Sequence, residues 1–336
     1  MNSGFQCFRR WPRLWLAAAW VTAVLPVAAQ TNDPYAPKPE VPPGFILVGG
    51  DILMPAPPPG PQPKSPFSPD PTTYWPGGIV PYEFDANVSA ANQSAMLAAM
   101  AQWQNAANVQ FVARSSESDY VHIQNSTGNN SAIGRLGGEQ FINIYNWNLT
   151  FKMAHELGHC LGLGHTQTRS DRSSFVSINY ANIQPDYAGQ FDVQVGFNDY
   201  GPYDFDSVMQ YDQCAFSIDC AAGFTCPCTR HVIDVLPPND TYWQSRIGQR
   251  DHLSDFDKLV MSFLYPYSNW RFVDLNFTGS PQLGTFLRPF KAFNGGETSV
   301  PNDGTVWVQP GRYAAVGTHS KPMTIKAPLG GVTLSN

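Results

Sequence analysis

Charged side chains are scarce in this sequence of 336 residues, at 14%, whereas hydrophobic residues make up 43%. A chain with little charge and many apolar residues can bury a core, which excludes an intrinsically disordered protein. Basic residues are also fewer than acidic ones, 20 against 26, so the formal net charge is −6. This shortage of positive charge argues against nucleic acid as the main partner.

Long apolar runs are missing beyond the first 30 residues, so we expect no membrane-spanning segment there. The start of the chain carries Arg9, Arg10 and Arg13, an apolar run over 14–27 and small residues after it. This pattern predicts a signal peptide over residues 1–29. An uncleaved anchor is the alternative, which the shortness of the run disfavours. The remaining protein is expected to be secreted (extracellular or periplasmic) and not attached to the membrane, with its oligomeric state left open.

Cysteines are few, six in all, and Cys7 belongs to the expected signal peptide. Four others lie close together at Cys214, Cys220, Cys226 and Cys228, without the C-x-x-C spacing of a zinc knuckle. Export favours disulfides over a structural zinc site for these four. A bond between Cys226 and Cys228 would be strained, so each is expected to pair with Cys214 or Cys220, in either order.

Proline is abundant, by contrast, and is concentrated in residues 30–73. Such a composition cannot form a helix or a central strand, and it predicts an extended linker or pro-segment. Within it, the stretch from Phe45 to Leu53 is an apolar island interrupted by Gly49, Gly50 and Asp51.

The remaining chain alternates between helical and strand patterns, which predicts an α+β domain over 74–268. We expect strands at 79–84, 109–112, 120–124 and 141–145, and helices that begin after Ser89, near Thr150 and near Asp251. The segment 180–238 is rich in loops. Residues 269–336 have Gly and Pro turns between short strand-like runs and are expected to form a separate small β region, similar to one or two rungs of a β-solenoid.

The chemistry of the chain centres on a run from His155 to His165. Positions i and i+4 share one helix face, so His155 and His159 can hold one metal ion. Gly162 can adopt the left-handed conformation that ends the helix, after which His165 supplies a third nitrogen. Three protein ligands leave one coordination position for water, as in a catalytic zinc site, and Glu156 can reach that water. A buried amphipathic helix with incidental histidines is the alternative.

Several flanking segments support a family resemblance. They are 75–82 (WPGGIVPY), 133–140 (IGRLGGEQ), 178–183 (INYANI), 207–211 (SVMQY) and 247–250 (IGQR). Together with the histidine run they resemble the astacin family of metzincin peptidases over about residues 74–268. The resemblance implies a metzincin-type catalytic domain, with an N-terminal mixed twisted sheet and two helices, an active-site cleft and an irregular C-terminal subdomain. It also implies an endopeptidase that hydrolyses protein or peptide substrates through a zinc-bound water, with one Zn²⁺ per chain and no other cofactor.

The same resemblance implies roles for further residues. Glu156 would act as the general base, and Tyr211 would stabilise the oxyanion. Met209 would lie in a turn beneath the metal. A substrate-binding edge strand would contain Arg135, Gly137, Gly138 and Gln140.

Asp51 is the expected latency residue. The family has a pro-segment in which the Asp of F-x-G-D occupies the zinc, and this chain has Val48-Gly49-Gly50-Asp51. The expected product is therefore a latent zymogen. An ordinary Gly-Gly-Asp turn is the alternative for this stretch.

Two other functions fit parts of the pattern. A different metzincin, such as a matrixin-like peptidase, would share the chemistry, and only the flanking segments argue against it. A metal-stabilised adhesion or binding protein without activity is the second, and the presence of all three histidines together with Glu156 argues against it.

Overall fold

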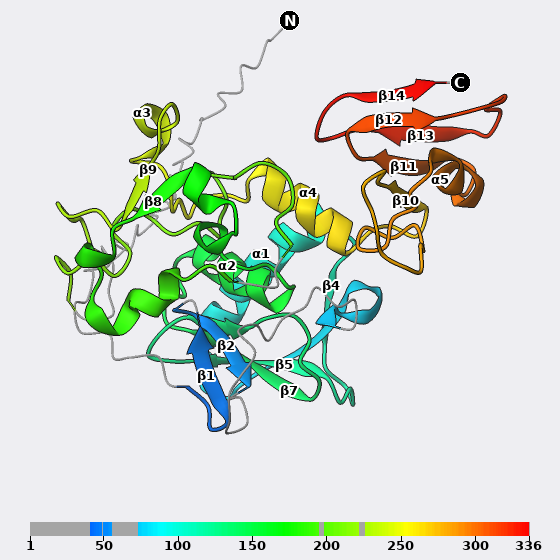
Figure 1. Ribbon diagram of the computed structural model, residues 1–336. Helices are drawn as coiled ribbons and strands as arrows, with labels where there is room; N and C mark the ends of the chain where they lie inside the picture. Colours follow the sequence, from blue (N-terminus) through cyan, green and yellow to red (C-terminus); the bar gives the residue numbers. More distant parts are fainter. Residues whose placement is uncertain (1–40, 49, 56–72, 195–197, 222–225, 336) are drawn as a thin grey trace, which may run out of the picture. The chain divides into compact units, whose positions relative to one another are not determined.

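The computed structural model describes residues 41–48, 50–55, 73–194, 198–221 and 226–335 (Figure 1). The expected signal peptide, Gly49 and most of the proline-rich segment lie outside the described residues. Among the described residues, no helix has the length and apolar character that crossing a membrane requires.

A mixed sheet of seven strands organises the first half of the described chain. Its order is β1 (Phe45–Val48), β2 (Ile52–Pro55), β6 (Asn130–Ala132), β7 (Glu139–Ile144), β5 (Tyr120–Asn125), β3 (Ile79–Phe84) and β4 (Gln110–Ala113). Strands β4, β3, β5 and β7 run parallel, whereas β6 is antiparallel to β7. The four strands expected from the sequence after residue 73 are confirmed: β3 has the expected ends, and the ends of β4, β5 and β7 differ by at most two residues.

The apolar island in the proline-rich segment forms an antiparallel hairpin, β1–β2, instead of an extended linker. β2 joins the sheet by pairing in parallel with β6, and Ile52 and Leu53 are buried there. The expectation that this segment cannot form a central strand was therefore wrong at β2, which lies between β1 and β6. Their apolar side chains are removed from water only if the segment docks on the sheet.

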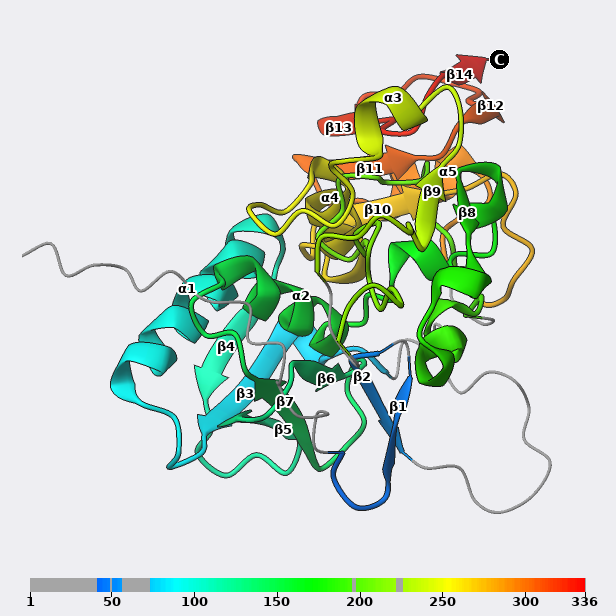
Figure 2. The same cartoon turned by 90° about the vertical axis from the view of Figure 1, so that its left-hand side faces the viewer.

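Two helices, α1 (Ala90–Ala106) and α2 (Thr150–Cys160), cover one face of this sheet (Figure 2). The Ser89 side chain accepts a hydrogen bond from the backbone of Asn92 and so caps the start of α1. The Trp103 indole on α1 donates to the carbonyl of Ala154 on α2 at 2.8 Å. This bond between buried groups fixes α2, which carries the histidine motif, against α1.

The segment after α2 is irregular, as the sequence predicted. Its described residues include a short antiparallel pair, β8 (Val176–Ile178) and β9 (Ile233–Val235), and the helix α3 (Asp240–Trp243). Short 3₁₀ turns also occur in it, at η3 (Thr166–Thr168), η4 (Arg172–Ser174), η5 (Tyr180–Asn182) and η6 (Pro185–Phe191), while a further one, η2 (Pro76–Gly78), directly precedes β3. Disulfides join Cys214 to Cys228 and Cys220 to Cys226, which resolves the pairing that the sequence left open.

Helix α4 (Asp255–Leu264) begins four residues later than expected, because Ser254 and Asp257 form a capping box at its start. A further helix, α5 (Phe293–Ser299), follows it in the C-terminal region, where the sequence predicted only short strands and turns. The sequence pattern did not predict α5 because the helix contains Gly295 and Gly296, and glycine has a low helix propensity. A Cβ on Gly296 would lie 2.5 Å from the Val273 side chain, so the close packing of α5 requires glycine.

The C-terminal residues form strands that stack in parallel. Strand β11 (Gly304–Val308) lies between β10 (Trp270–Val273) and β13 (Met323–Lys326), and β12 (Gly311–Ala314) pairs with β14 (Val332–Ser335). Parallel stacking of successive turns is the pairing that a β-solenoid uses. Phe272 and Trp307 of this region pack on Phe263 of α4, with ring centroids 5.1 and 4.8 Å away.

Candidate metal centre

Three histidines meet at the end of α2. The Nε2 atoms of His155 and His159 lie 3.1 Å apart, and that of His165 lies 3.1 Å from His159 and 3.3 Å from His155. Gly162 turns the chain between them with φ +105°, and its amide donates to the His159 carbonyl at 2.7 Å. All three rings are buried.

The protonation of these rings follows from their other nitrogens. His155 Nδ1 donates to the Val208 carbonyl at 2.8 Å, and His159 Nδ1 donates to the Leu163 carbonyl at 2.7 Å. With Nδ1 engaged, His155 and His159 direct Nε2 at each other and at His165, as ligands around a shared metal ion do. Zinc with nitrogen ligands at about 2.0–2.1 Å in tetrahedral geometry would separate the nitrogens by about 3.3 Å. The observed separations fit a zinc ion.

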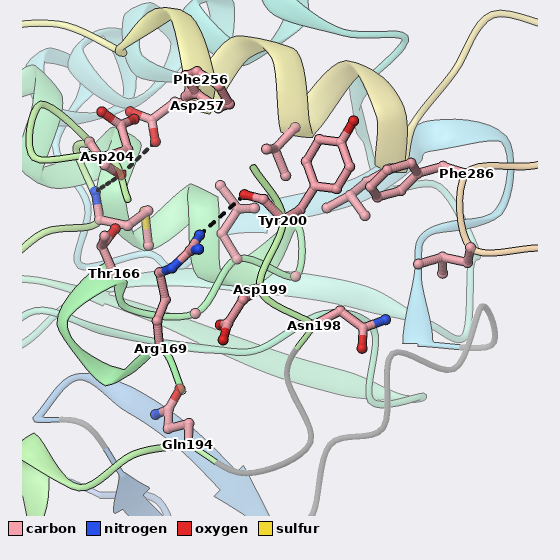
Figure 3. Close-up of a pocket in the computed structure, with 18 of the residues that line it drawn as sticks. Thr166, Arg169, Gln194, Asn198, Asp199, Tyr200, Asp204, Phe256, Asp257 and Phe286 are labelled. Atoms are coloured by element: carbon pink, nitrogen blue, oxygen red, sulfur yellow. Dashed lines mark hydrogen bonds between the residues drawn. The ribbon is translucent and has the colours of Figure 1, made fainter. Parts of the chain in front are cut away.

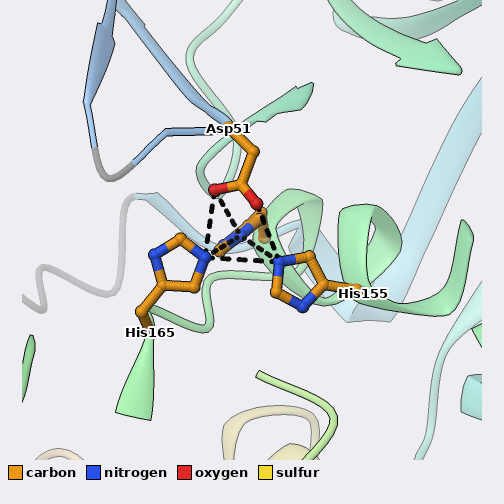
Figure 4. A group of neighbouring side chains, drawn as sticks. Asp51, His155 and His165 are labelled. Carbon is orange, nitrogen blue, oxygen red and sulfur yellow. Dashed lines mark hydrogen bonds and ion pairs between the residues drawn. The ribbon is translucent and has the colours of Figure 1, made fainter. Parts of the chain in front are cut away.

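Asp51 enters this centre from the turn between β1 and β2 (Figure 4). Its Oδ1 lies 3.0 Å from His165 Nε2 and 3.6 Å from His159 Nε2, and its Oδ2 lies 3.1 Å from His155 Nε2. Burial alone would raise the pKa of Asp51, but His165 and the hydrogen bonds from all three imidazoles hold it well below its usual range. The carboxylate is thus held as an anion against the three rings.

Backbone contacts fix the position of Asp51. The amide of Ser131 on β6 donates to the Asp51 carbonyl at 2.8 Å. Gly50 has φ +91°, and a Cβ there would lie 2.6 Å from the Tyr211 hydroxyl oxygen and 3.1 Å from the Phe216 ring. Glycine is required here on both counts, conformation and space.

Glu156 lies on α2 next to His155 and is buried. Its Oε2 has no hydrogen-bond partner among the described residues. Burial, and then the charge of Asp51, raise the pKa of Glu156 well above its usual value. An unpaired buried carboxylate is costly, which is typical of a functional group and not of a structural one.

The loop from Ser207 to Tyr211 lies beneath the histidines. A Cβ on Gly158 of α2 would lie 2.7 Å from Met209 Sδ, so the methionine packs directly against the helix that carries the ligands. The Tyr211 ring lies 4.5 Å from that of His165, and its hydroxyl donates to Asp51 Oδ1 at 3.4 Å. The structure therefore places both the turn and the tyrosine beside the three histidines.

Two residues that shape the centre had no role assigned from the sequence. Asp257 accepts from the Ser207 hydroxyl at 2.6 Å and from the Val208 amide at 2.8 Å, so α4 anchors the loop whose carbonyl orients His155. The spacing of Ser254 and Asp257 as a capping box was the available signal. Phe216, which contacts the Gly50 position, gave no signal in the sequence.

The predicted substrate edge strand is corrected by the sheet order. Arg135, Gly137 and Gly138 lie in the turn before β7, where Arg135 pairs with Asp119 at 2.5 Å and the Gly138 amide donates to the same carboxylate. Gln140 is buried in β7, which has β6 and β5 as neighbours on its two sides. The strand that pairs with the β1–β2 hairpin is β6. The sequence did not reveal that a short strand at 130–132 would separate β7 from the edge.

A hollow of about 660 Å³ lies between the loop after α2, helix α4 and the C-terminal region (Figure 3). Arg169, Tyr200 and Phe286 contribute to its walls, and Asp204 and Asp257 lie side by side at one end of it. Burial raises the pKa of Asp204 to about 6. His165 and Met209 also line this hollow, whereas Asp51, Glu156 and Tyr211 are not among its lining residues.

Comparisons with known proteins agree with this geometry. The sheet, the two helices and the three-histidine centre define a metzincin-type peptidase fold. Residues 67–266 match the family model described as Astacin, a peptidase family, so the chain belongs to the astacin family, as the resemblance predicted.

Relatives and a solved structure carry the same assignment. High choriolytic enzyme 1 of Oryzias latipes is 35% identical over 56% of this chain and 66% of its own length. Zinc metalloproteinase nas-31 of Caenorhabditis elegans is 39% identical over 58% of this chain and 30% of its own length. The solved structure of the Oryzias latipes enzyme, a hatching enzyme zinc-protease, aligns with a TM-score of 0.53 and 31% identity over 60% of this chain and 98% of that one. The chain thus spans less than two thirds of the full length of these two relatives.

Proposed function

We propose that this protein is a secreted, zinc-dependent endopeptidase that is made as a latent zymogen. The observation that carries the proposal is the convergence of three histidine Nε2 atoms on one point, with a buried, unpaired Glu156 carboxylate beside them. The family named in the comparisons is a peptidase family, and several relatives carry the names of zinc proteases.

One zinc ion would be held by His155, His159 and His165. When bound, zinc lowers the pKa of water and polarises a carbonyl group. The protein holds the three rings ready for it, since the carbonyls of Val208 and Leu163 fix the tautomers of His155 and His159.

Glu156 would act as the general base. It takes a proton from the attacking water and passes that proton to the leaving amine. Its buried position supports this role, because a carboxylate whose pKa is raised by burial is a stronger base than an exposed one.

Tyr211 would donate a hydrogen bond to the oxygen of the scissile carbonyl as negative charge develops on it. Burial, followed by the nearby Asp51 carboxylate, raises the pKa of Tyr211 well above its usual value. The phenol therefore stays protonated near neutral pH and remains a donor.

An extended peptide substrate would pair with β6. The backbone of β6 now pairs with β2 at Ser131 and Ala132, and these groups become available when the hairpin leaves. Backbone pairing of this kind recognises an extended chain with little regard to side chains, which suits proteins and peptides as substrates.

Asp51 would keep the enzyme latent. A carboxylate is a competent zinc ligand, and its tether within the same chain gives it a high effective concentration at the metal. In the present arrangement Asp51 and the β1–β2 hairpin occupy both the metal centre and the β6 backbone. Cleavage in the proline-rich segment before Tyr74 would release them.

Export is the last part of the proposal. The pattern over residues 1–29 is typical of a signal peptide. In addition, two disulfides cross-link the loop 214–228. Disulfides persist outside the reducing cytosol, so they are consistent with an extracellular or periplasmic protein.

The test is a peptide-cleavage assay on the protein after removal of residues 30–73. We expect cleavage that a chelator abolishes and that added Zn²⁺ restores. Glu156→Gln, which keeps the size and hydrogen-bonding shape of the side chain, is the matched control. Equal cleavage by the control variant would show that a contaminant is responsible and would refute the proposal.

A further inference from the structure

A second group of metal-binding side chains lies on the face of the sheet away from α1 and α2. Strands β3, β5 and β7 run side by side there (Figure 2). Glu83 on β3 is the register partner of His122 on β5, and Glu139 on β7 is the partner of Tyr120, two residues earlier. Side chains alternate along a strand, and Val121 and Ile123 point into the core. His122 therefore lies on the opposite face.

Two carboxylates converge on one nitrogen of His122. Its Nδ1 lies 3.2 Å from Glu83 Oε1 and 3.2 Å from Glu139 Oε1. One ligand atom from each of the three residues lies within 4.8 Å of the other two. Among the described residues, the three-histidine centre with Asp51 is the other group that meets this criterion.

The other ring nitrogen of His122, Nε2, has a carboxylate neighbour of its own. His122 Nε2 lies 3.1 Å from Asp85 Oδ2, within hydrogen-bond distance. Histidines that bind metals are commonly held in this way, with one nitrogen donating to a carboxylate and the other facing the ion. With Nε2 beside Asp85, Nδ1 is the nitrogen that faces Glu83 Oε1 and Glu139 Oε1, at the spacing of ligands around one ion.

The summed charge of the side chains around His122 also favours a bound cation. Glu83, Asp85 and Glu139 contribute three negative charges, and Arg114, whose Nη1 lies 2.9 Å from Glu83 Oε2, contributes one positive charge. These four side chains sum to −3 + 1 = −2, which one divalent cation would offset. The carboxylates are also held in place, because the Tyr120 hydroxyl donates to Glu139 Oε1 at 2.7 Å.

We propose that Glu83, His122 and Glu139 form a second divalent-cation site, with Zn²⁺ as the ion. A mixed set of one imidazole and two carboxylates suits zinc better than calcium or magnesium, which prefer oxygen ligands alone. The three ligands come from three adjacent strands, so the ion joins them on the exposed face of the sheet. Its role is to stabilise the sheet that carries the substrate-binding side, and the site does not depend on the proposed peptidase activity.

The rival explanation needs no metal. A doubly protonated His122 would share its Nδ1 proton between Glu83 and Glu139. The two explanations differ in one measurable quantity, the number of zinc ions that each chain retains.

The experiment measures zinc per chain by elemental mass spectrometry after equilibrium dialysis over a graded series of free Zn²⁺ concentrations. We compare the wild-type chain with His122→Ala and Glu139→Gln, and Asp255→Asn serves as a control because its carboxylate is exposed and remote. We expect two saturable zinc ions in the wild type and the control, and one in each of the other variants. Circular dichroism of each variant reports whether it is folded, and Glu139→Gln changes a side chain that is 43% exposed, so its fold should be retained.

Two results would overturn the proposal. One is a zinc content of the wild-type chain that equals that of folded His122→Ala at every concentration. The other is a second zinc ion that persists in folded Glu139→Gln. A thermal shift on addition of zinc that is present in the wild type and absent in Glu139→Gln would further support the bridging role.

Discussion

Asp51 Oδ1 lies 3.0 Å from His165 Nε2, although 114 positions separate the two residues in the chain (165 − 51). This contact joins the N-terminal hairpin to the metal centre. It depends on Gly50, because any side chain there would meet Tyr211 and Phe216.

The first prediction concerns this contact. Asp51→Ala in the chain that retains residues 30–73 is expected to release the metal centre and give premature peptide cleavage or faster self-cleavage. The measurement is the rate of cleavage of a fluorogenic peptide by the uncleaved variant, with chain length followed by mass spectrometry. Asp192→Asn, an exposed acid outside the hairpin, is the control and should remain latent. An Asp51→Ala variant that stays inactive until its pro-segment is cleaved would contradict the role of Asp51. It would leave the peptidase proposal intact.

The second prediction separates metal binding from proton transfer. Glu156→Gln is expected to retain zinc at the wild-type level, because the three histidines and their carbonyl partners are unchanged. Its kcat should fall by about 10²–10⁴ or more, the usual contribution of a general acid–base group. Zinc content and single-turnover cleavage by the same preparation provide the check. Loss of zinc together with activity would mean that Glu156 has a structural role.

The sequence predicted the parts of this protein whose patterns are local. The helix that carries His155 and His159, the turn at Gly162 and the cap at Ser89 each depend on a few neighbouring residues. The position of Asp51 came from family resemblance, and the structure brings it to the histidines. What the sequence missed depends on contacts between distant segments. The three-residue strand β6 has too short a pattern to detect, and it moves the edge of the sheet away from Gln140.

The third prediction concerns the packing of the C-terminal region on α4. Phe263 is buried among Phe272, Trp307 and other aromatic rings. Phe263→Ala should lower the free energy of unfolding by about 3–5 kcal/mol, the usual cost of deleting a buried aromatic side chain. Urea unfolding followed by tryptophan fluorescence measures it, with Tyr267→Ala as an exposed control. A loss below about 1 kcal/mol would mean that the site collapses around the deleted ring.

The fourth prediction concerns pH. Burial raises the pKa of Asp204 to about 6, above the value of an unfolded aspartate, so the folded protein binds a proton more tightly there. The stability that this residue contributes is therefore present below about pH 4 and is lost as pH rises through about 6. Asp204→Asn should be more stable than the wild type above pH 6, by at most about 3 kcal/mol, with the difference vanishing toward pH 4. Thermal or urea unfolding across that range tests it. A gap that is constant with pH would show that Asp204 does not titrate in this window.

The fifth prediction concerns Tyr211 in the chain freed of residues 30–73. The Tyr211→Phe variant keeps the ring against His165 and loses only the hydroxyl that now donates to Asp51. A donor that acts on charge developing in the transition state affects kcat more than substrate binding, and removing one costs about 10²–10³ in rate. We therefore expect kcat to fall by that factor while KM changes little. The same substitution in the uncleaved chain should weaken latency slightly, since Asp51 loses one hydrogen bond. Steady-state kinetics with one peptide give both constants, and an unchanged kcat with a raised KM would assign Tyr211 to substrate binding instead.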